Sequence, residues 1–223
     1  MDGNLQIIKD RPKIAAGIDG DFFVKLYKMP GIAAQISRRF RSGRAVHCLF
    51  AAEVFQNCGA MTPPVVAALE LHCGKHICDF LITEKLPENC RTLNYFLHEN
   101  DFSGREAWNF IVEKSLPEIA RIHNSGIIHG DLNLRNLYPL SDKIGFIDLD
   151  SAICNSVPAD IPARDKELAR LLSGFLRFKN FKDLNIDELA SELVVAYKRF
   201  SPVQCCKENI IRRANYLLDR LYI

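Results

Sequence analysis

The chain has 223 residues, with 29 basic and 27 acidic side chains and a formal net charge of +2 at pH 7. This length can bury a sizeable core, and the near balance of charge provides no global field that would attract nucleic acid. The sequence has no uninterrupted apolar run near the roughly 18 residues of a membrane span, and no basic and apolar leader pattern at its start, so we expect a cytoplasmic protein without a nucleic-acid partner.

Three short strands are expected at the start of the chain, at residues 5–8, 13–17 and 22–28. Residues 18–21, between the second and third strands, have the sequence Ile-Asp-Gly-Asp, which is typical of a hairpin turn. Lys25 then lies at the centre of the third strand.

A helix is expected next, at residues 45–57, which are rich in Ala, Leu and Phe and contain Glu53 as their only carboxylate. Four arginines fall within seven positions around its start: Arg38, Arg39, Arg41 and Arg44. Such a cluster is either a solvated loop or a contact for phosphate groups, which could belong to a nucleotide, an anionic glycolipid or a membrane surface.

Two consecutive helices are predicted around the middle of the chain, at residues 104–114 and 116–124. The sequence Ser-Leu-Pro-Glu at residues 115–118 indicates a capping box with proline in the first turn of the second helix. Gly126 would end that helix.

The most informative stretch follows at residues 129–136, with the sequence His-Gly-Asp-Leu-Asn-Leu-Arg-Asn. In the kinase catalytic loop H-R-D-x-x-x-x-N, the Asp orients the attacking hydroxyl, and the Asn five residues later binds magnesium. Asp131 and Asn136 keep this interval. Each residue alone could be a turn residue or a helix cap, but the combined pattern favours a phosphoryl-transfer site.

A hairpin is expected to bring a second metal ligand to this loop. Residues 137–140 and 144–147 are two short apolar strands around the polar turn 141–143, and Asp148 follows directly. The hairpin would place Asp148 beside Asn136, and these oxygen ligands suit Mg²⁺, which would fill its other positions with phosphate oxygens and water.

These residues predict an ATP- and Mg²⁺-dependent phosphotransferase. Asp131 would orient and deprotonate the acceptor hydroxyl, while Asn136 and Asp148 would bind the metal. Lys25 would hold the α- and β-phosphates, as the lysine of V-A-I-K does in protein kinases, with Glu53 as its default partner. The alternative for Lys25 is a solvated strand lysine, and the alternative for Glu53 is a surface contact.

The rest of the chain is expected to be helical. Only sixteen residues separate Asp148 from Asp165, and the Ala-Pro-Glu that closes a protein-kinase activation segment is missing, so a peptide-docking platform is not expected. Amphipathic helices are predicted at residues 164–177, 187–200 and 207–221. Asp165 would either brace the catalytic loop by hydrogen-bonding the backbone of that loop, or cap the first of these helices.

These motifs resemble those of the lipopolysaccharide core kinase family, bacterial enzymes that phosphorylate heptose or Kdo in the inner core. The family pattern H-G-D-L-N-x-x-N followed by I-D-x-D is matched by residues 129–136 and 147–150, and residues 59–64 resemble its G-x-x-T-P turn. The resemblance runs through most of the chain, although a glycine-rich phosphate loop is absent. It implies an α+β, reduced bilobal protein-kinase-like fold with a small antiparallel sheet in the N-lobe and a helical C-lobe.

The resemblance also implies the domain organisation and the nucleotide contacts. Residues 1–223 would form a single kinase-like domain, with an N-lobe at about residues 1–86, a hinge at about 84–91 and a C-lobe at about 92–223. The hinge residues Glu84, Lys85 and Leu86 would bind the adenine, through backbone groups rather than side chains.

By the same resemblance, the acceptor would be a heptose or Kdo hydroxyl of the lipopolysaccharide core, a glycolipid, and the protein could contact the inner membrane peripherally. Another small hydroxyl acceptor remains an alternative. The rival interpretations are a small atypical Ser/Thr protein kinase of the RIO type, a pseudokinase scaffold that binds nucleotide without turnover, and an aminoglycoside or choline phosphotransferase. The last class commonly has His where this chain has Asn133.

Overall fold

The computed structural model of the chain describes residues 5–28, 43–73, 76–178 and 184–220. The chain forms two compact units, one of Met1–Val54 with Thr62–Pro87 and the other of Phe55–Met61 with Glu88–Ile223. Three of the four clustered arginines, Arg38, Arg39 and Arg41, lie outside the described residues. The division into an N-lobe, a hinge and a C-lobe within one domain stays a prediction.

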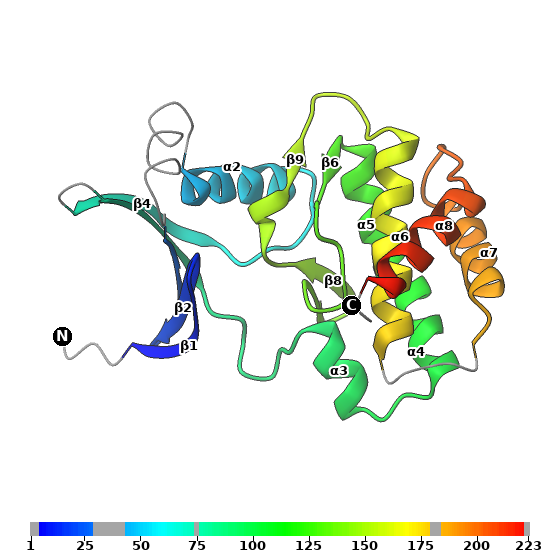
Figure 1. Ribbon diagram of the computed structural model, residues 1–223, viewed down its shortest axis with the longest axis horizontal. Coiled ribbons are helices and arrows are strands. Elements are labelled where there is room, and N and C mark those ends of the chain that lie inside the picture. Colours follow the sequence, from blue (N-terminus) through cyan, green and yellow to red (C-terminus); the bar gives the residue numbers. More distant parts are fainter. Residues whose placement is uncertain (1–4, 29–42, 74–75, 179–183, 221–223) are drawn as a thin grey trace. The chain divides into compact units, whose positions relative to one another are not determined.

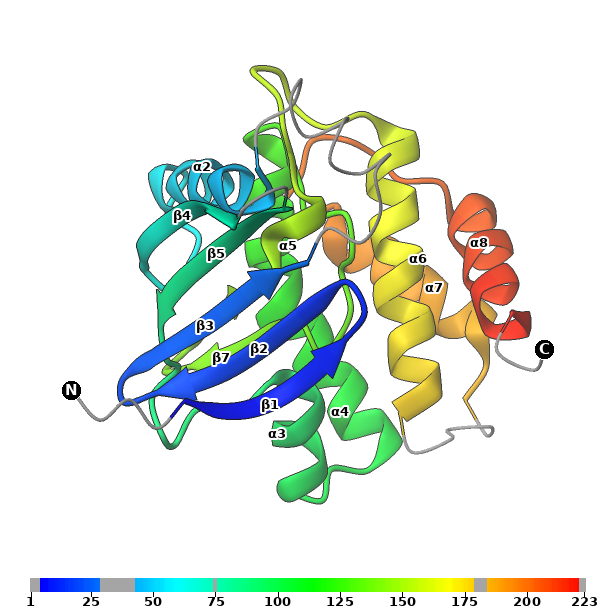
Figure 2. The same cartoon turned by 60° about the vertical axis from the view of Figure 1, so that its left-hand side comes forward.

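The first unit contains a five-stranded antiparallel sheet (Figure 2). Its strands, in chain order, are β1 (Gln6–Arg11), β2 (Ile14–Asp19), β3 (Phe22–Tyr27), β4 (Val65–Cys73) and β5 (His76–Glu84), and their order in the sheet is β1-β2-β3-β5-β4. Lys25 pairs with Ala16 on β2 and with Leu81 on β5, so it lies within the central strand, as predicted.

Helix α2 (Arg44–Asn57) packs its first turns against this sheet, beside β4 and β5 (Figure 2). The contact is a small hydrophobic cluster of Tyr27, Ala45, Cys48 and Leu81. Asp79 on β5 accepts a hydrogen bond of 2.8 Å from the Arg44 amide and so satisfies one of the free backbone donors at the start of the helix.

The second unit is mainly helical (Figure 1). Its helices are α3 (Leu93–Glu99), α4 (Gly104–Phe110), the π-helical turn η1 (Ile111–Ser115), α5 (Leu116–Asn124), α6 (Ile161–Arg177), α7 (Ile186–Tyr197) and α8 (Lys207–Asp219). Helix α6 packs against α8, and α7 contacts α5, α6 and α8. No helix in the described part of the chain combines the length and the apolar character needed to cross a bilayer.

Two short antiparallel strand pairs lie between α5 and α6 in the chain. Strand β6 (Ile127–Ile128) pairs with β9 (Ile153–Cys154), and β7 (Leu137–Leu140) pairs with β8 (Lys143–Phe146). The second pair is the hairpin predicted from the sequence. The 3₁₀ turn η2 (Leu149–Ser151) connects β8 to β9.

The predicted capping box at Ser115 was wrong. Ser115 has α-helical backbone angles and lies in the π-helical turn that joins α4 to α5, and the capping box is formed by Ser103 and Glu106 at the start of α4. Pro117 has no amide hydrogen to donate, and it lies in the first turn of α5, one residue beyond Leu116, which follows the π-helical turn. Helix α5 thus begins at Leu116, as predicted, but directly after a π-helical turn and without a capping side chain.

Helix α6 begins three residues earlier than predicted. Asp160 caps it, because the side chain accepts a hydrogen bond from the Ala163 amide at 2.9 Å. The predicted apolar face is confirmed, since its members are fully buried: Leu168, Leu171, Leu172 and Phe175. Each such side chain stabilises the fold by about 1.5–3 kcal/mol.

Candidate active site

The loop between β6 and β7 contains Asp131 and Asn136, which are in direct contact. Asn136 Nδ2 donates to the Asp131 carbonyl at 2.9 Å and to the Asp131 carboxylate at 3.2 Å. Asn133 adds a second restraint, because its Nδ2 donates to the same Asp131 carbonyl at 3.0 Å while its Oδ1 accepts from the Arg135 amide at 2.9 Å. The loop thus fixes the backbone of Asp131 while its side chain stays exposed.

The β7–β8 hairpin brings Asp148 back to this loop. The Ile147 amide donates to the Asn136 carbonyl at 2.9 Å, which continues the strand pairing to the residue before Asp148. Asp148 has φ 62° and ψ 57°, a left-handed conformation that Asp adopts more readily than most residues. The structure therefore brings together the three residues predicted to orient the hydroxyl and bind the metal.

The donor set of Asn136 and Asp148 fits Mg²⁺. Because Nδ2 of Asn136 points to Asp131, its Oδ1 is the atom left to act as an oxygen ligand. Asp148 supplies a carboxylate, and Mg²⁺ is commonly held by one or two such protein oxygens together with substrate phosphates and water.

His129 connects the loop that contains Asp131 to the segment that ends at Asp148. Its Nε2 donates to the Ile147 carbonyl at 3.0 Å, and its Nδ1 accepts from the Asp131 amide at 3.3 Å, so these two partners select the Nε2–H tautomer. The ring is fully buried and packs edge-on against Phe55, with 6.3 Å between ring centroids. His129 therefore has a structural role.

Gly130 is required by the close approach of the segment after Asp148. Its φ is +86°, and a Cβ atom at this position would lie 2.0 Å from the Ser151 carbonyl oxygen. Only glycine fits both the left-handed backbone and the available space.

Glu167 on α6 holds the backbone of the loop. Its carboxylate accepts from the Gly130 amide at 2.7 Å and from the His129 amide at 2.8 Å. This bracing role was predicted for Asp165, which instead accepts from the Cys206 amide at 3.0 Å and from Asn209 Nδ2 at 3.1 Å. Asp165 thus joins α6 to the start of α8 and does not cap α6.

A helical-wheel reading could have found Glu167. It lies four positions before Leu171 and three after Arg164, so it falls on the buried face of α6. A carboxylate on such a face needs hydrogen-bond donors, and the backbone amides of a glycine-containing loop can supply them.

A directed chain of buried hydrogen bonds supports Glu167. Arg164 donates to the Tyr197 hydroxyl at 2.8 Å, so that hydroxyl donates in turn to His123 Nδ1 at 2.8 Å. His123 Nε2 then donates to Glu167 at 3.4 Å. Burial raises the pKa of Tyr197 to about 12, which keeps the hydroxyl protonated and able to donate.

Burial and these hydrogen bonds together set the charges of His123 and Glu167. Burial lowers the pKa of His123 below its ordinary value of 6.5, which favours the neutral ring that the hydrogen bonds require. Burial by itself would raise the pKa of Glu167, but the hydrogen bonds from His123 and from the His129 amide outweigh it, and the pKa of Glu167 is lowered. Glu167 is therefore an ionised acceptor under the loop.

The predicted nucleotide-binding residues lie in the first unit. Lys25 is 8% exposed, and its Nζ lies 5.1 Å from the centre of the Tyr27 ring, whereas Glu53 is exposed on α2. The Glu84 amide donates to the Pro64 carbonyl at 3.0 Å, and the Lys85 amide donates to the Asp21 carbonyl at 2.7 Å. Two of the three predicted hinge amides are thus already engaged.

Comparison with known proteins places these residues in a family context. The model of the lipopolysaccharide kinase (Kdo/WaaP) family matches residues 27–192. A 3-deoxy-D-manno-octulosonic acid kinase from Vibrio parahaemolyticus serotype O3:K6 is 34% identical over 95 residues. That alignment covers 42% of this chain and 37% of the relative, so it spans well under half of the relative's length.

Solved structures show the same protein-kinase-like α+β fold. The structure of WaaP in complex with acyl carrier protein has a TM-score of 0.61 at 18% identity, with 99% of this chain and 87% of that chain covered. A choline/ethanolamine kinase family protein from Mesorhizobium loti has a TM-score of 0.54 at 12% identity, with coverage of 99% and 79%. A WbdD structure with a kinase inhibitor has a TM-score of 0.53 at 16% identity, with coverage of 95% and 49%. The predicted fold class is confirmed.

Proposed function

Since the chain belongs to the lipopolysaccharide kinase (Kdo/WaaP) family, we propose that it transfers the γ-phosphoryl group of ATP to a sugar hydroxyl of the lipopolysaccharide inner core. The observation that carries the proposal is the hydrogen-bonded pair of Asp131 and Asn136, with Asp148 held next to it through the Ile147–Asn136 hydrogen bond. This arrangement supports the proposal, because it offers an exposed carboxylate and two side chains with oxygen atoms of the kind that phosphoryl transfer requires.

Asp131 would accept a hydrogen bond from the sugar hydroxyl and take its proton as the phosphoryl group is transferred. Asn136 and Asp148 would hold Mg²⁺, which when bound neutralises charge on the phosphates. Asn136 would then have two functions, because its amide nitrogen donates to Asp131 and its amide oxygen would bind the cation.

Lys25 would hold the α- and β-phosphates, with Glu53 as its proposed partner. Adenine would be bound by backbone groups of Glu84, Lys85 and Leu86. Because the amides of Glu84 and Lys85 donate to Pro64 and Asp21, the Leu86 amide is the hinge donor best suited to an adenine nitrogen.

The similarity to a 3-deoxy-D-manno-octulosonic acid kinase favours that sugar over heptose as the acceptor. The acceptor would then be part of a glycolipid, and the protein would meet it from the cytoplasm at the inner membrane surface. Arg44 could contribute positive charge to such a contact.

The test is phosphorylation of defined core acceptors by the purified protein with ATP and Mg²⁺, followed by mass spectrometry of the sugar. We expect the mass of one phosphate to be added to an acceptor that ends in octulosonic acid, and none without Mg²⁺. Phosphate on the protein alone, with every sugar unmodified, would contradict the proposal and favour a protein kinase. Phosphorylation of a heptose-terminated acceptor instead would show that the acceptor sugar is heptose, and the proposed reaction would stand.

A further inference from the structure

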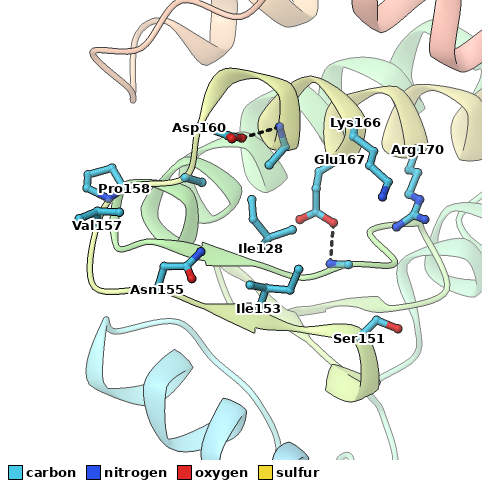
Figure 3. A pocket seen from close by; sticks show the side chains of 13 residues that line it. Ile128, Ser151, Ile153, Asn155, Val157, Pro158, Asp160, Lys166, Glu167 and Arg170 are labelled. Carbon is cyan, nitrogen blue, oxygen red and sulfur yellow. Dashed lines mark hydrogen bonds between the residues drawn. The ribbon is translucent and has the colours of Figure 1, made fainter.

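A pocket of about 450 Å³ lies in the second unit beside the catalytic loop (Figure 3). Its walls are the β6–β9 pair, the segment before α6, and the first turns of α6 itself. Lys166, Arg170 and Ser151 gather at one end, and Val157 and Pro158 lie at the other (Figure 3). The pocket therefore has a cationic end, and apolar side chains contribute to the opposite end.

Arg170 carries the main evidence that a ligand belongs at the cationic end. Its Nη1 atom is buried and has no hydrogen-bond partner in the described part of the chain. A buried guanidinium nitrogen without an acceptor is unfavourable, and native structures normally supply one from protein, water or ligand. Lys166, one helical turn earlier and more exposed, lines the same end of the pocket.

The carboxylates in the pocket wall are directed to other partners. Glu167 accepts from the amides of His129 and Gly130, and Asp160 accepts from the Ala163 amide. Neither carboxylate forms a hydrogen bond with the unpartnered Nη1 of Arg170. The positive charge of Arg170, which lines the pocket and is partly exposed, is therefore not neutralised by either wall carboxylate through this atom.

The position of the pocket relates it to the reaction. Gly130, which precedes Asp131, lines the pocket. The residue before the one proposed to orient the acceptor hydroxyl is thus part of the pocket wall.

We propose that this pocket binds the acceptor sugar, with Lys166 and Arg170 holding an anionic group on the same sugar that is phosphorylated. The guanidinium fork of Arg170 matches the paired oxygens of a carboxylate or a phosphate. Ile153 and Val157 are exposed apolar side chains in the pocket wall, suited to the C–H face of a sugar ring. The inference rests on the proposed function, because it assigns the substrate recognition of the same site.

The binding test uses free 3-deoxy-D-manno-octulosonic acid without nucleotide, measured by isothermal titration calorimetry on the full chain. We expect Arg170→Gln and Lys166→Gln each to weaken binding at least tenfold, and Arg170→Lys to retain part of it. Lys198→Gln, an exposed charge change after α7, should bind as the wild type does. Titrations with the carboxyl-reduced sugar and with inorganic phosphate then show whether the site binds a carboxylate or a phosphate.

The kinetic test separates this inference from the proposed function. If Lys166 and Arg170 bind the acceptor, both substitutions raise the KM for the acceptor and leave the KM for ATP unchanged. Unchanged acceptor KM in an active enzyme would overturn the pocket assignment alone. Binding that depends on Arg170, without phosphorylation of any sugar, would contradict the proposed function and retain the pocket. Failure of the wild type to bind the sugar acid or phosphate would also overturn the pocket assignment.

Discussion

Glu167 Oε1 lies 2.7 Å from the backbone nitrogen of Gly130, the residue immediately before Asp131. The second carboxylate oxygen accepts from the His129 amide at 2.8 Å, so one buried side chain on α6 fixes two consecutive peptide groups of the loop. The position of Asp131 thus depends on a helix whose carboxylate is 37 residues away in the chain.

Glu167→Gln tests this dependence. Glutamine has one acceptor oxygen, so one of the two loop amides is left without a partner and faces an NH₂ group. We expect the free energy of unfolding to fall by about 1–3 kcal/mol, measured by urea denaturation, and turnover to fall by about 100-fold as the loop shifts. Glu99→Gln, at an exposed site on α3, is the matched control. Wild-type stability and turnover in Glu167→Gln would refute the bracing role.

Gly130→Ala tests the close approach of the chain at Ser151. The added Cβ would meet the Ser151 carbonyl oxygen at 2.0 Å in a left-handed backbone conformation. We expect a loss of at least about 2 kcal/mol in the free energy of unfolding, visible as a lower melting temperature, together with loss of turnover. Gly174→Ala is the control, because its Cβ would meet nothing closer than 3.7 Å. Equal melting temperatures for the two variants would contradict the account.

His123 should make stability depend on pH. Its pKa is lowered by burial from 6.5, so the unfolded chain binds a proton at pH values where the folded chain does not. The free energy of unfolding should therefore decrease as the pH falls below about 6.5, by up to about 1.4 kcal/mol per pH unit. His123→Gln should show a shallower decrease in urea denaturation between pH 7.5 and 5.5, whereas His98→Gln, an exposed site, should follow the wild type. Identical slopes for all three proteins would exclude His123 as the source.

Asp148→Asn tests the proposed metal ligand with little effect on the backbone. Asn tolerates the left-handed conformation of residue 148 about as well as Asp does, so the variant should keep its melting temperature. Loss of a carboxylate ligand removes several kcal/mol of charge stabilisation, and we expect turnover to fall at least about 100-fold. Asp142→Asn, in the exposed turn of the same hairpin, should keep full turnover. Full turnover in Asp148→Asn would exclude Asp148 as a metal ligand.

The sequence predicted the features that depend on local patterns. The strand that contains Lys25, the β7–β8 hairpin and the apolar face of α6 were all readable, because alternation, turn residues and helical spacing act over a few positions. The roles of Lys25 and of the residues around Asp131 stay predictions.

The features that the sequence did not reveal depend on contacts between distant segments or on how one helix passes into the next. Glu167 was missed because its partners, the amides of residues 129 and 130, are far away in the chain. The bounds of α5 were predicted correctly, but the capping box at Ser115 was not, because a π-helical turn ends at Ser115 and leaves no free helix end there to cap.

The most direct test of the central claim is sugar phosphorylation by Asp131→Asn, measured beside its affinity for ATP. If Asp131 takes the proton of the acceptor hydroxyl, turnover should fall by about 10²- to 10⁴-fold while ATP affinity and melting temperature remain those of the wild type. Asn keeps an oxygen at this position that can accept from Asn136, so the loop should persist. Sugar phosphorylation at the wild-type rate in Asp131→Asn would contradict the assignment of this loop as the catalytic site.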